Sequence, residues 1–99
     1  MLSLFWRRKM EIEKRKHAGY DEFERAVKKG VKIKQYFGKY QYIYSNKKQK
    51  ISLVELWDMF GDKWFWEIAI LKDDGVDGES VERFATQQDA IKKIKELLA

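Results

Sequence analysis

Residues 31–45 read VKIKQYFGKYQYIYS, and the pairing of this stretch decides the fold that the sequence predicts. Three lysines and four tyrosines lie among apolar residues on the two sides of Gly38. Apolar residues at alternating positions are typical of strands, so we expect a β-hairpin that turns at Gly38 and Lys39. Glycine at the first position of a two-residue loop favours a type II′ turn.

The length of this turn sets which side chains reach the surface. A two-residue loop places the tyrosines of the second strand on the core face, together with Ile33 and Phe37. A three-residue loop shifts the pairing by one residue and moves every side chain of one strand to the other face. That register would gather Tyr36, Lys32, Lys34 and two tyrosines on a surface suited to stacked bases and phosphates. The turn chemistry favours the first register, and the second remains the alternative.

Two helices are predicted before this hairpin. Residues 2–17 contain neither proline nor glycine, and Glu11 and Arg15 stand at the spacing of a helical ion pair. The segment DEFERAVKKG, residues 21–30, begins with Asp21 as a possible N-cap and ends at Gly30. We therefore expect a long basic helix followed by a short one.

Two units of similar plan follow the short helix. In the first, the hairpin of residues 31–45 and the polar loop NKKQK lead to a helix over residues 52–61, where Ser52 and Glu55 have capping-box spacing. In the second, WFWEIAILK (64–72) and VERFA (81–85) form a hairpin. A helix capped by Thr86 then follows, with apolar residues at helical spacing. These are Ala90, Ile91, Ile94, Leu97 and Leu98.

The predicted fold is α+β, with the order ααββαββα and an antiparallel four-stranded sheet that has helices packed on at least one face. The 99 residues are expected to form one domain, because 44% are apolar and 15% aromatic. Within it we distinguish a basic helical N-terminal segment (1–30), a first ββα unit (31–61) and a second ββα unit (62–99).

The sequence contains no clear motif for catalysis or for binding a metal ion. The chain has no cysteine and only one histidine, His17, which we place at the basic end of the first helix. The loop DDGVDG (73–78) begins like a calcium loop, but Phe84 stands where a bidentate glutamate is required. We therefore interpret the loop as an ordinary acidic turn, and we expect no metal, no cofactor and no enzymatic activity.

The N-terminus, MLSLFW followed by RRK, is too short to span a membrane and has its basic residues on the wrong side for a signal peptide. Its aromatic residues could lie on a membrane surface. We favour the alternative that Phe5 and Trp6 cap the core or contact a dimer partner. The sequence thus predicts a cytoplasmic protein without a membrane span.

Charge is distributed unevenly along the chain. Residues 1–50 hold 15 basic and 5 acidic side chains, a net charge of +10, whereas residues 51–99 hold 6 and 11, a net charge of −5. Such asymmetry indicates a basic surface that attracts polyanions, although the two halves could instead attract each other within the fold or across a dimer.

These features predict a small, basic, non-enzymatic nucleic-acid-binding protein that contacts the phosphates of DNA or RNA with little sequence specificity. The expected contact residues are Lys28, Lys29, Lys32, Lys34, Tyr36, Lys39, Lys47, Lys48 and Lys50. The alternative is a protein–protein interaction module, either a homodimer or a viral or phage factor that binds a host protein. Trp64 and Trp66 would anchor that interface.

The charged, cysteine-free composition and the segments KWFWEIAIL and VERFATQQDAIKKIKELL resemble small orphan proteins of filamentous viruses that infect hot, acidic archaea, the lipothrixviruses and rudiviruses. This resemblance implies a thermostable viral protein of the host cytoplasm, encoded by a double-stranded DNA virus. It implies no site residue.

Overall fold

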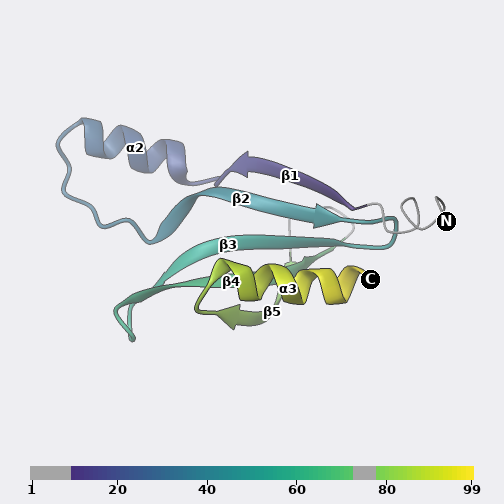
Figure 1. Cartoon of the computed structure of the whole chain (residues 1–99). Coiled ribbons are helices and arrows are strands. Elements are labelled where there is room, and N and C mark those ends of the chain that lie inside the picture. The colour runs from purple at the N-terminus through teal and green to yellow at the C-terminus, as the bar shows by residue number, and fades with distance from the viewer. Residues whose placement is uncertain (1–9, 73–77) are drawn as a thin grey trace.

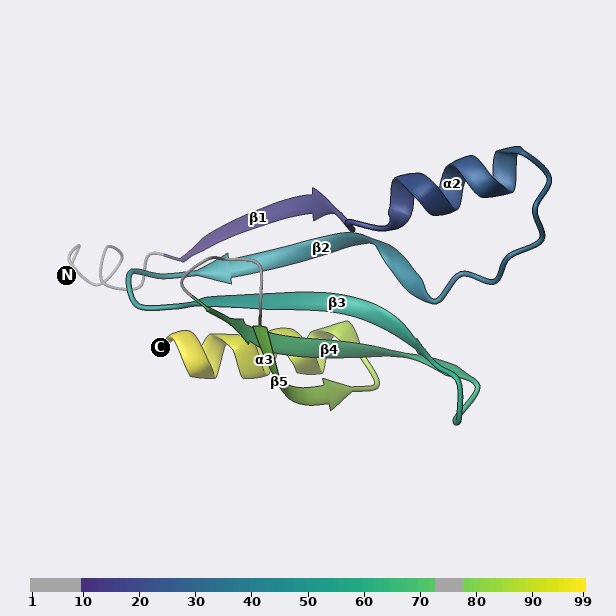
Figure 2. The ribbon, with the colours of Figure 1, turned by 180° about the vertical axis from the view of Figure 1, so that it is seen from behind.

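The computed structural model describes residues 10–72 and 78–99, which form one antiparallel five-stranded sheet and two helices (Figure 1). The elements in chain order are β1 (Glu11–Lys16), α2 (Tyr20–Lys28), β2 (Phe37–Ser45), β3 (Lys50–Asp58), β4 (Lys63–Leu71), β5 (Gly78–Phe84) and α3 (Gln87–Leu98). The strands lie side by side in chain order, as a meander. Helix α3 lies along one face of the sheet, and α2 lies beyond the ends of β1 and β2 (Figures 1 and 2).

The core is the contact between α3 and the middle of the sheet. Ala90 and Ile94 of α3 are fully buried, as are Ile51, Leu53 and Ile68 of β3 and β4. Strand alternation places these three residues, with Tyr42 and Tyr44 of β2, on the side that we call the helix-bearing face. Fully burying an isoleucine or leucine side chain stabilises a fold by about 1.5–3 kcal/mol.

The C-terminal helix was predicted correctly, including its cap. The Thr86 side chain accepts a hydrogen bond from the backbone N–H of Asp89 at 3.2 Å. At the other end, the Asn46 side-chain amide donates to the Leu98 carbonyl at 2.9 Å, and that of Gln49 donates to the Leu97 carbonyl at 2.8 Å. These bonds satisfy carbonyls that lack partners within the helix and tie its end to the β2–β3 turn.

The α+β character is confirmed, but the order ααββαββα and the four-stranded sheet are wrong. Residues 11–16 form β1 instead of a helix, while residues 2–9 lie outside the described part of the chain. β1 pairs with β2 from Glu11 opposite Ser45 to Lys16 opposite Tyr40. An exposed helical ion pair contributes only about 0.2–0.5 kcal/mol. Pairing with β2 instead provides cross-strand side-chain contacts, such as that of Lys14 with Tyr40, which an exposed helix would lack.

The helix predicted over residues 52–61 is also wrong, because residues 50–58 form β3. Ser52 does not cap a helix: its hydroxyl accepts a hydrogen bond from the Gln41 side-chain amide at 2.8 Å. β3 pairs along its whole length with β4, from Lys50 opposite Leu71 to Asp58 opposite Lys63. Its apolar residues therefore lie on both faces of a central strand. The resulting continuous apolar run in the sequence is also typical of a short buried helix.

The predicted turn at Gly38 and Lys39 is wrong in both registers, because β2 runs straight through it. Gly38, Lys39 and Tyr40 together stand opposite the single residue Glu55, which makes a bulge in β2. A Cβ atom on Gly38 would lie 3.2 Å from the Cβ of Glu55, so a larger residue there would require Glu55 to shift by a few tenths of an ångström.

The hairpin turn instead joins β2 to β3 at residues 46–49. The Asn46 side-chain oxygen accepts hydrogen bonds from the backbone N–H groups of Lys48 at 2.8 Å and Gln49 at 2.9 Å. Asparagine favours turns because its side chain can bond to the backbone in this way.

Helix α2 was predicted nearly in place, although Gly19 precedes it where Asp21 was expected as the cap. Gly30, just beyond the helix, has a φ of 87°, the left-handed conformation expected of a terminal glycine. No residue of α2 is buried. The helix is held by an aromatic contact in which His17 stacks on Phe37 at 4.2 Å between ring centroids and Phe23 meets the same ring edge-on at 6.3 Å.

His17 therefore precedes α2, whereas we had placed it at the end of a helix. Its Nδ1 accepts a hydrogen bond from the backbone N–H of Gly19 at 3.2 Å, and burial lowers its pKa below the usual range. The neutral imidazole suits this position, because a positive charge near a helix N-terminus is unfavourable.

The molecule is elongated, with extents of 56 × 26 × 22 Å and a radius of gyration of 15.6 Å. A compact domain of this length has a radius of gyration of about 13 Å. The β3–β4 hairpin extends past α3, with Met59 and Phe60 exposed at its tip (Figure 1). The sheet thus has a stretch on its helix-bearing face that α3 does not cover.

Candidate nucleic-acid interface

Beyond the N-terminal end of α3, the helix-bearing face continues as a surface that we call the aromatic shelf. It consists of Tyr40, Trp57 and Trp64 with the lysines Lys14 and Lys34. The alternation of β2, β3 and β4 places the three rings on the same face as the core residues, but outside the core that α3 covers. All three rings are half-buried.

Lysine ammonium groups lie over the rings of the shelf. The Nζ atom of Lys14, in β1, is 4.0 Å from the centroid of the Tyr40 ring, and that of Lys34 is 3.8 Å from the Trp57 ring. A third lysine, Lys39, lies 5.5 Å from Tyr40 and 5.7 Å from Tyr20. Cations within about 6 Å of an aromatic face are attracted to its π-electrons.

The shelf also holds its tryptophan rings in place. Trp57 and Trp64 are directly opposite each other in β3 and β4, and their rings meet at 72° with centroids 5.5 Å apart. Edge-to-face pairs of this kind are a favoured aromatic arrangement. The Trp57 backbone is fixed as well, because its N–H donates to the Tyr36 carbonyl at 2.8 Å.

Acidic partners leave these lysines largely available. Among the residues that the structure describes, Lys14 forms no ion pair, and Lys34 lies 3.7 Å from Asp62. The carboxylate of Asp62 is 83% exposed, so this pair contributes little to stability. Both ammonium groups could therefore contact a phosphate at small cost.

Charge is polarised across the helix-bearing face. Lys14 and Lys16 lie at its β1 edge, whereas Glu79 and Glu82 lie at its β5 edge. A polyanion would accordingly lie toward β1 and β2 and avoid β5. The charge asymmetry seen along the sequence thus becomes an asymmetry from one edge of the sheet to the other.

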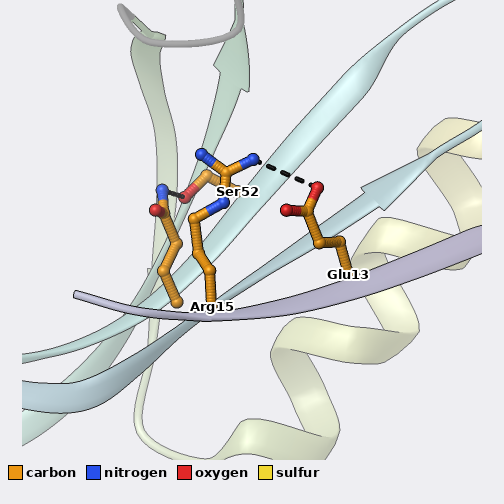
Figure 3. Close-up of polar contacts among 4 residues, drawn as sticks. Glu13, Arg15 and Ser52 are labelled. Carbon is orange, nitrogen blue, oxygen red and sulfur yellow. Dashed lines mark hydrogen bonds and ion pairs between the residues drawn. The ribbon is translucent and has the colours of Figure 1, made fainter. Parts of the chain in front are cut away.

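The opposite face has a different character, because its charges are paired. Glu13 and Arg15 of β1 form an ion pair at 3.1 Å, and Ser52 of β3 lies beside them on the side away from α3 (Figure 3). Farther across the sheet, Arg83 pairs with Glu67 at 3.3 Å. A surface with interspersed acidic groups attracts phosphates less than the aromatic shelf does.

Besides Asp62, the carboxylate of Glu55 also lies close to the shelf. Glu55 is two positions before Trp57 on the same face of β3 and stands opposite the bulge that contains Tyr40. Burial raises the pKa of its carboxyl above the usual range. When ionised, this carboxyl would repel an anion from its part of the shelf.

The predicted lysines do not form one surface. Lys28 and Lys29 lie at the end of α2, and Lys32, Lys34 and Tyr36 lie in the extended segment before β2, whereas Lys47, Lys48 and Lys50 surround the β2–β3 turn. Lys39 lies within β2 near the first group. The nine residues from Phe37 to Ser45 separate the two groups by about 27 Å at the usual rise of a strand. Only the first group adjoins the shelf.

The two predicted interface tryptophans also have separate positions. Trp64 belongs to the shelf through its contact with Trp57. Trp66 packs against the core beneath α3 and lies opposite Phe84 of β5. Both are half-buried, so neither stands out as an exposed anchor for a protein partner.

Sequence reasoning missed three members of the shelf, namely Lys14, Tyr40 and Trp57. Tyr40 was placed in the core in the favoured register, and the other two were assigned to helices. The alternation of Ile51, Leu53, Glu55 and Trp57 would have placed Trp57 on the core side of a strand. No local signal, however, joins Lys14 to Tyr40.

Comparison of this chain with protein-family models, with curated proteins and with solved structures found no match. The expected origin in a filamentous archaeal virus therefore stays a prediction. Within residues 10–72 and 78–99, no helix is long and apolar enough to cross a membrane, and no three potential metal ligands cluster.

Proposed function

We propose that this protein binds nucleic acid at the aromatic shelf, contacting phosphates through Lys14 and Lys34 with little sequence specificity. The observation that carries the proposal is the placement of both ammonium groups over aromatic rings on one face of the sheet, 4.0 and 3.8 Å from the ring centroids. Surfaces that combine lysines with aromatic rings bind nucleic-acid strands without reading their sequence.

The adjoining lysines enlarge this surface. Lys32 and Lys39 flank the shelf along the chain, and Lys28 and Lys29 precede them at the C-terminal end of α2. The net charge of +5 adds a long-range attraction for polyanions. Because phosphate contacts carry no sequence information, this arrangement favours general binding over recognition of one site.

Fluorescence anisotropy of labelled oligonucleotides at several salt concentrations tests the proposal. The logarithm of the binding constant should fall with the logarithm of the salt concentration, by about 0.7–0.9 per phosphate contact. The variant Lys14→Glu/Lys34→Glu should bind at least about tenfold more weakly at low salt, which corresponds to about 1.4 kcal/mol.

The β2–β3 turn, at the opposite end of the sheet from the shelf, offers a matched control. The variant Lys47→Glu/Lys48→Glu changes the net charge by the same amount at the β2–β3 turn, far from the shelf. It should weaken binding much less. Equal losses in the two variants would show that attraction is spread over the whole protein, and no binding at 50 mM salt would refute the proposal.

A second candidate function is protein–protein interaction, which the hairpin tip favours. Phe60 is 98% exposed and Met59 is 67% exposed at the end of the β3–β4 hairpin. Exposed aromatic and methionine side chains are enriched in protein interfaces. If the tip joins two copies of the chain, sedimentation should detect a dimer in the wild type and a monomer in Phe60→Ser. A wild-type monomer would rule out the homodimer.

A further inference from the structure

The rings of the aromatic shelf are capped by lysines in the free protein. Lys14 lies over Tyr40 and Lys34 lies over Trp57, each within about 4 Å of the ring centroid. Both lysine side chains are exposed, and in the described part of the chain their only ion pair is the one from Lys34 to Asp62 at 3.7 Å. The contacts between these lysines and the rings are therefore weak, and a ligand can displace the lysines from the rings.

A nucleobase is the natural replacement for such a cap. Stacking of a base on an aromatic ring is stronger than an exposed cation–π contact. When a base takes the ring, the displaced ammonium group stays beside it and can bind the phosphate of the same strand. One ring and one lysine thus make a paired contact to one nucleotide, and the shelf offers two such pairs.

We propose that the shelf selects single-stranded nucleic acid, with bases stacked on Tyr40 and Trp57 in place of Lys14 and Lys34. This inference rests on the proposed function and names the form of nucleic acid that the same site takes. A duplex keeps its base faces stacked inside and offers only phosphates to the lysines. Single strands expose base faces, so they gain both kinds of contact.

The geometry of the strands supports this selection. Tyr40 and Trp57 lie on adjacent strands of one sheet, and Trp57 is two residues beyond Glu55, the residue opposite the bulge that contains Tyr40. The edge-to-face contact with Trp64 fixes the plane of the Trp57 ring before any ligand binds. A preformed ring loses little conformational freedom on binding, which favours stacking.

Three probes of equal length separate stacking from charge: a single strand of oligo(dT), an abasic single strand with the same phosphates, and a duplex. Anisotropy at one fixed salt concentration should show oligo(dT) bound about tenfold or more tightly than the abasic strand, and more tightly than the duplex. Repeating the comparison with oligo(dU) and oligo(U), which differ only in the sugar, identifies the preferred sugar, and tighter binding of any of these strands than of the abasic one supports the proposal.

Two variants locate the stacking. Tyr40→Leu should weaken binding of oligo(dT) about tenfold and leave binding of the abasic strand unchanged. Val81→Leu, at a side chain that is 41% exposed in β5, on the opposite edge of the sheet from β1, should change neither. If Tyr40→Leu does not fold, stacking on Trp57 is tested instead by quenching of wild-type tryptophan fluorescence, which should occur with oligo(dT) but not with the abasic strand.

The outcomes distinguish this inference from the function on which it rests. Equal binding of oligo(dT) and the abasic strand, or binding of the duplex as tight as that of the single strand, overturns the stacking inference and leaves phosphate binding intact. Failure of all three probes to bind at low salt overturns both.

Discussion

Replacement of Ile94 by alanine tests the packing of α3 against the sheet. Ile94 is fully buried in the cluster that includes Ile51, Leu53 and Ile68. Truncating a buried isoleucine removes its contacts and leaves a cavity that the neighbours fill only in part, at a cost of about 2–5 kcal/mol. Proteins of about 100 residues have a free energy of unfolding of roughly 5–15 kcal/mol. Ile94→Ala should therefore remove a large share of the stability of a domain of this size.

Urea unfolding followed by tryptophan fluorescence and by far-ultraviolet circular dichroism measures this loss. The matched control is Ile12→Ala, because the same change is made at a side chain that is 57% exposed in β1. We expect the control to lose less than about 0.5 kcal/mol, as exposed substitutions generally do. Similar losses in the two variants, or a loss below about 1 kcal/mol in Ile94→Ala, would refute the placement of α3 over the sheet.

Two further predictions concern the turn and the docking of α2. Asn46→Ala removes the acceptor of the turn and the donor to the Leu98 carbonyl, so the free energy of unfolding should fall by about 1–3 kcal/mol in a urea titration; an unchanged midpoint would contradict this role. Because burial lowers the pKa of His17 in the folded state, the unfolded chain takes up its proton first as the pH falls. The stability should therefore decrease as the pH drops below about 6.5. Thermal melts from pH 7 to pH 5 should show that His17→Phe lacks this part of the decrease. If the melting temperatures of the two proteins fall in parallel with pH, His17 does not contribute.

Elements fixed by local signals were predictable from the sequence. The C-terminal helix has a capping threonine and apolar residues at helical spacing, and α2 ends at a glycine with positive φ. The β4 and β5 segments were recognised from their alternation and from the turn residues between them. Each of these signals lies within about a dozen consecutive residues, and such local patterns can be recognised in a single sequence.

Elements fixed by partners distant in the chain were not predictable. β1 has charges at helical spacing, and only its pairing with β2, across the inserted α2, makes it a strand. β3 has a capping-box pattern and a short apolar run that suit a helix equally well, and strands on both sides decide the outcome.

The candidate site divides in the same way. Lys34 and Lys39 were identified from the density of lysines and aromatics in one segment. The contact of Lys14 with Tyr40 depends on the β1–β2 pairing, and the place of Trp57 depends on β3 being a strand. Composition thus indicated the chemistry of the site, but the residues that form it could be identified only from the sheet topology.

The short outer strand β1 also has a consequence for how this protein avoids self-association. Five of its six residues are charged, and it covers the edge of residues 40–45, YQYIYS, which carry no charge. Six-residue segments of high β-propensity without charge or proline stack readily into amyloid-like fibrils when an edge is free. β1 therefore acts as a charged guard strand. Detaching β1 from β2, for example with Glu13→Pro, should cause the protein to form fibrils that bind thioflavin. A Glu13→Pro variant that stays monomeric would disprove the guarding role.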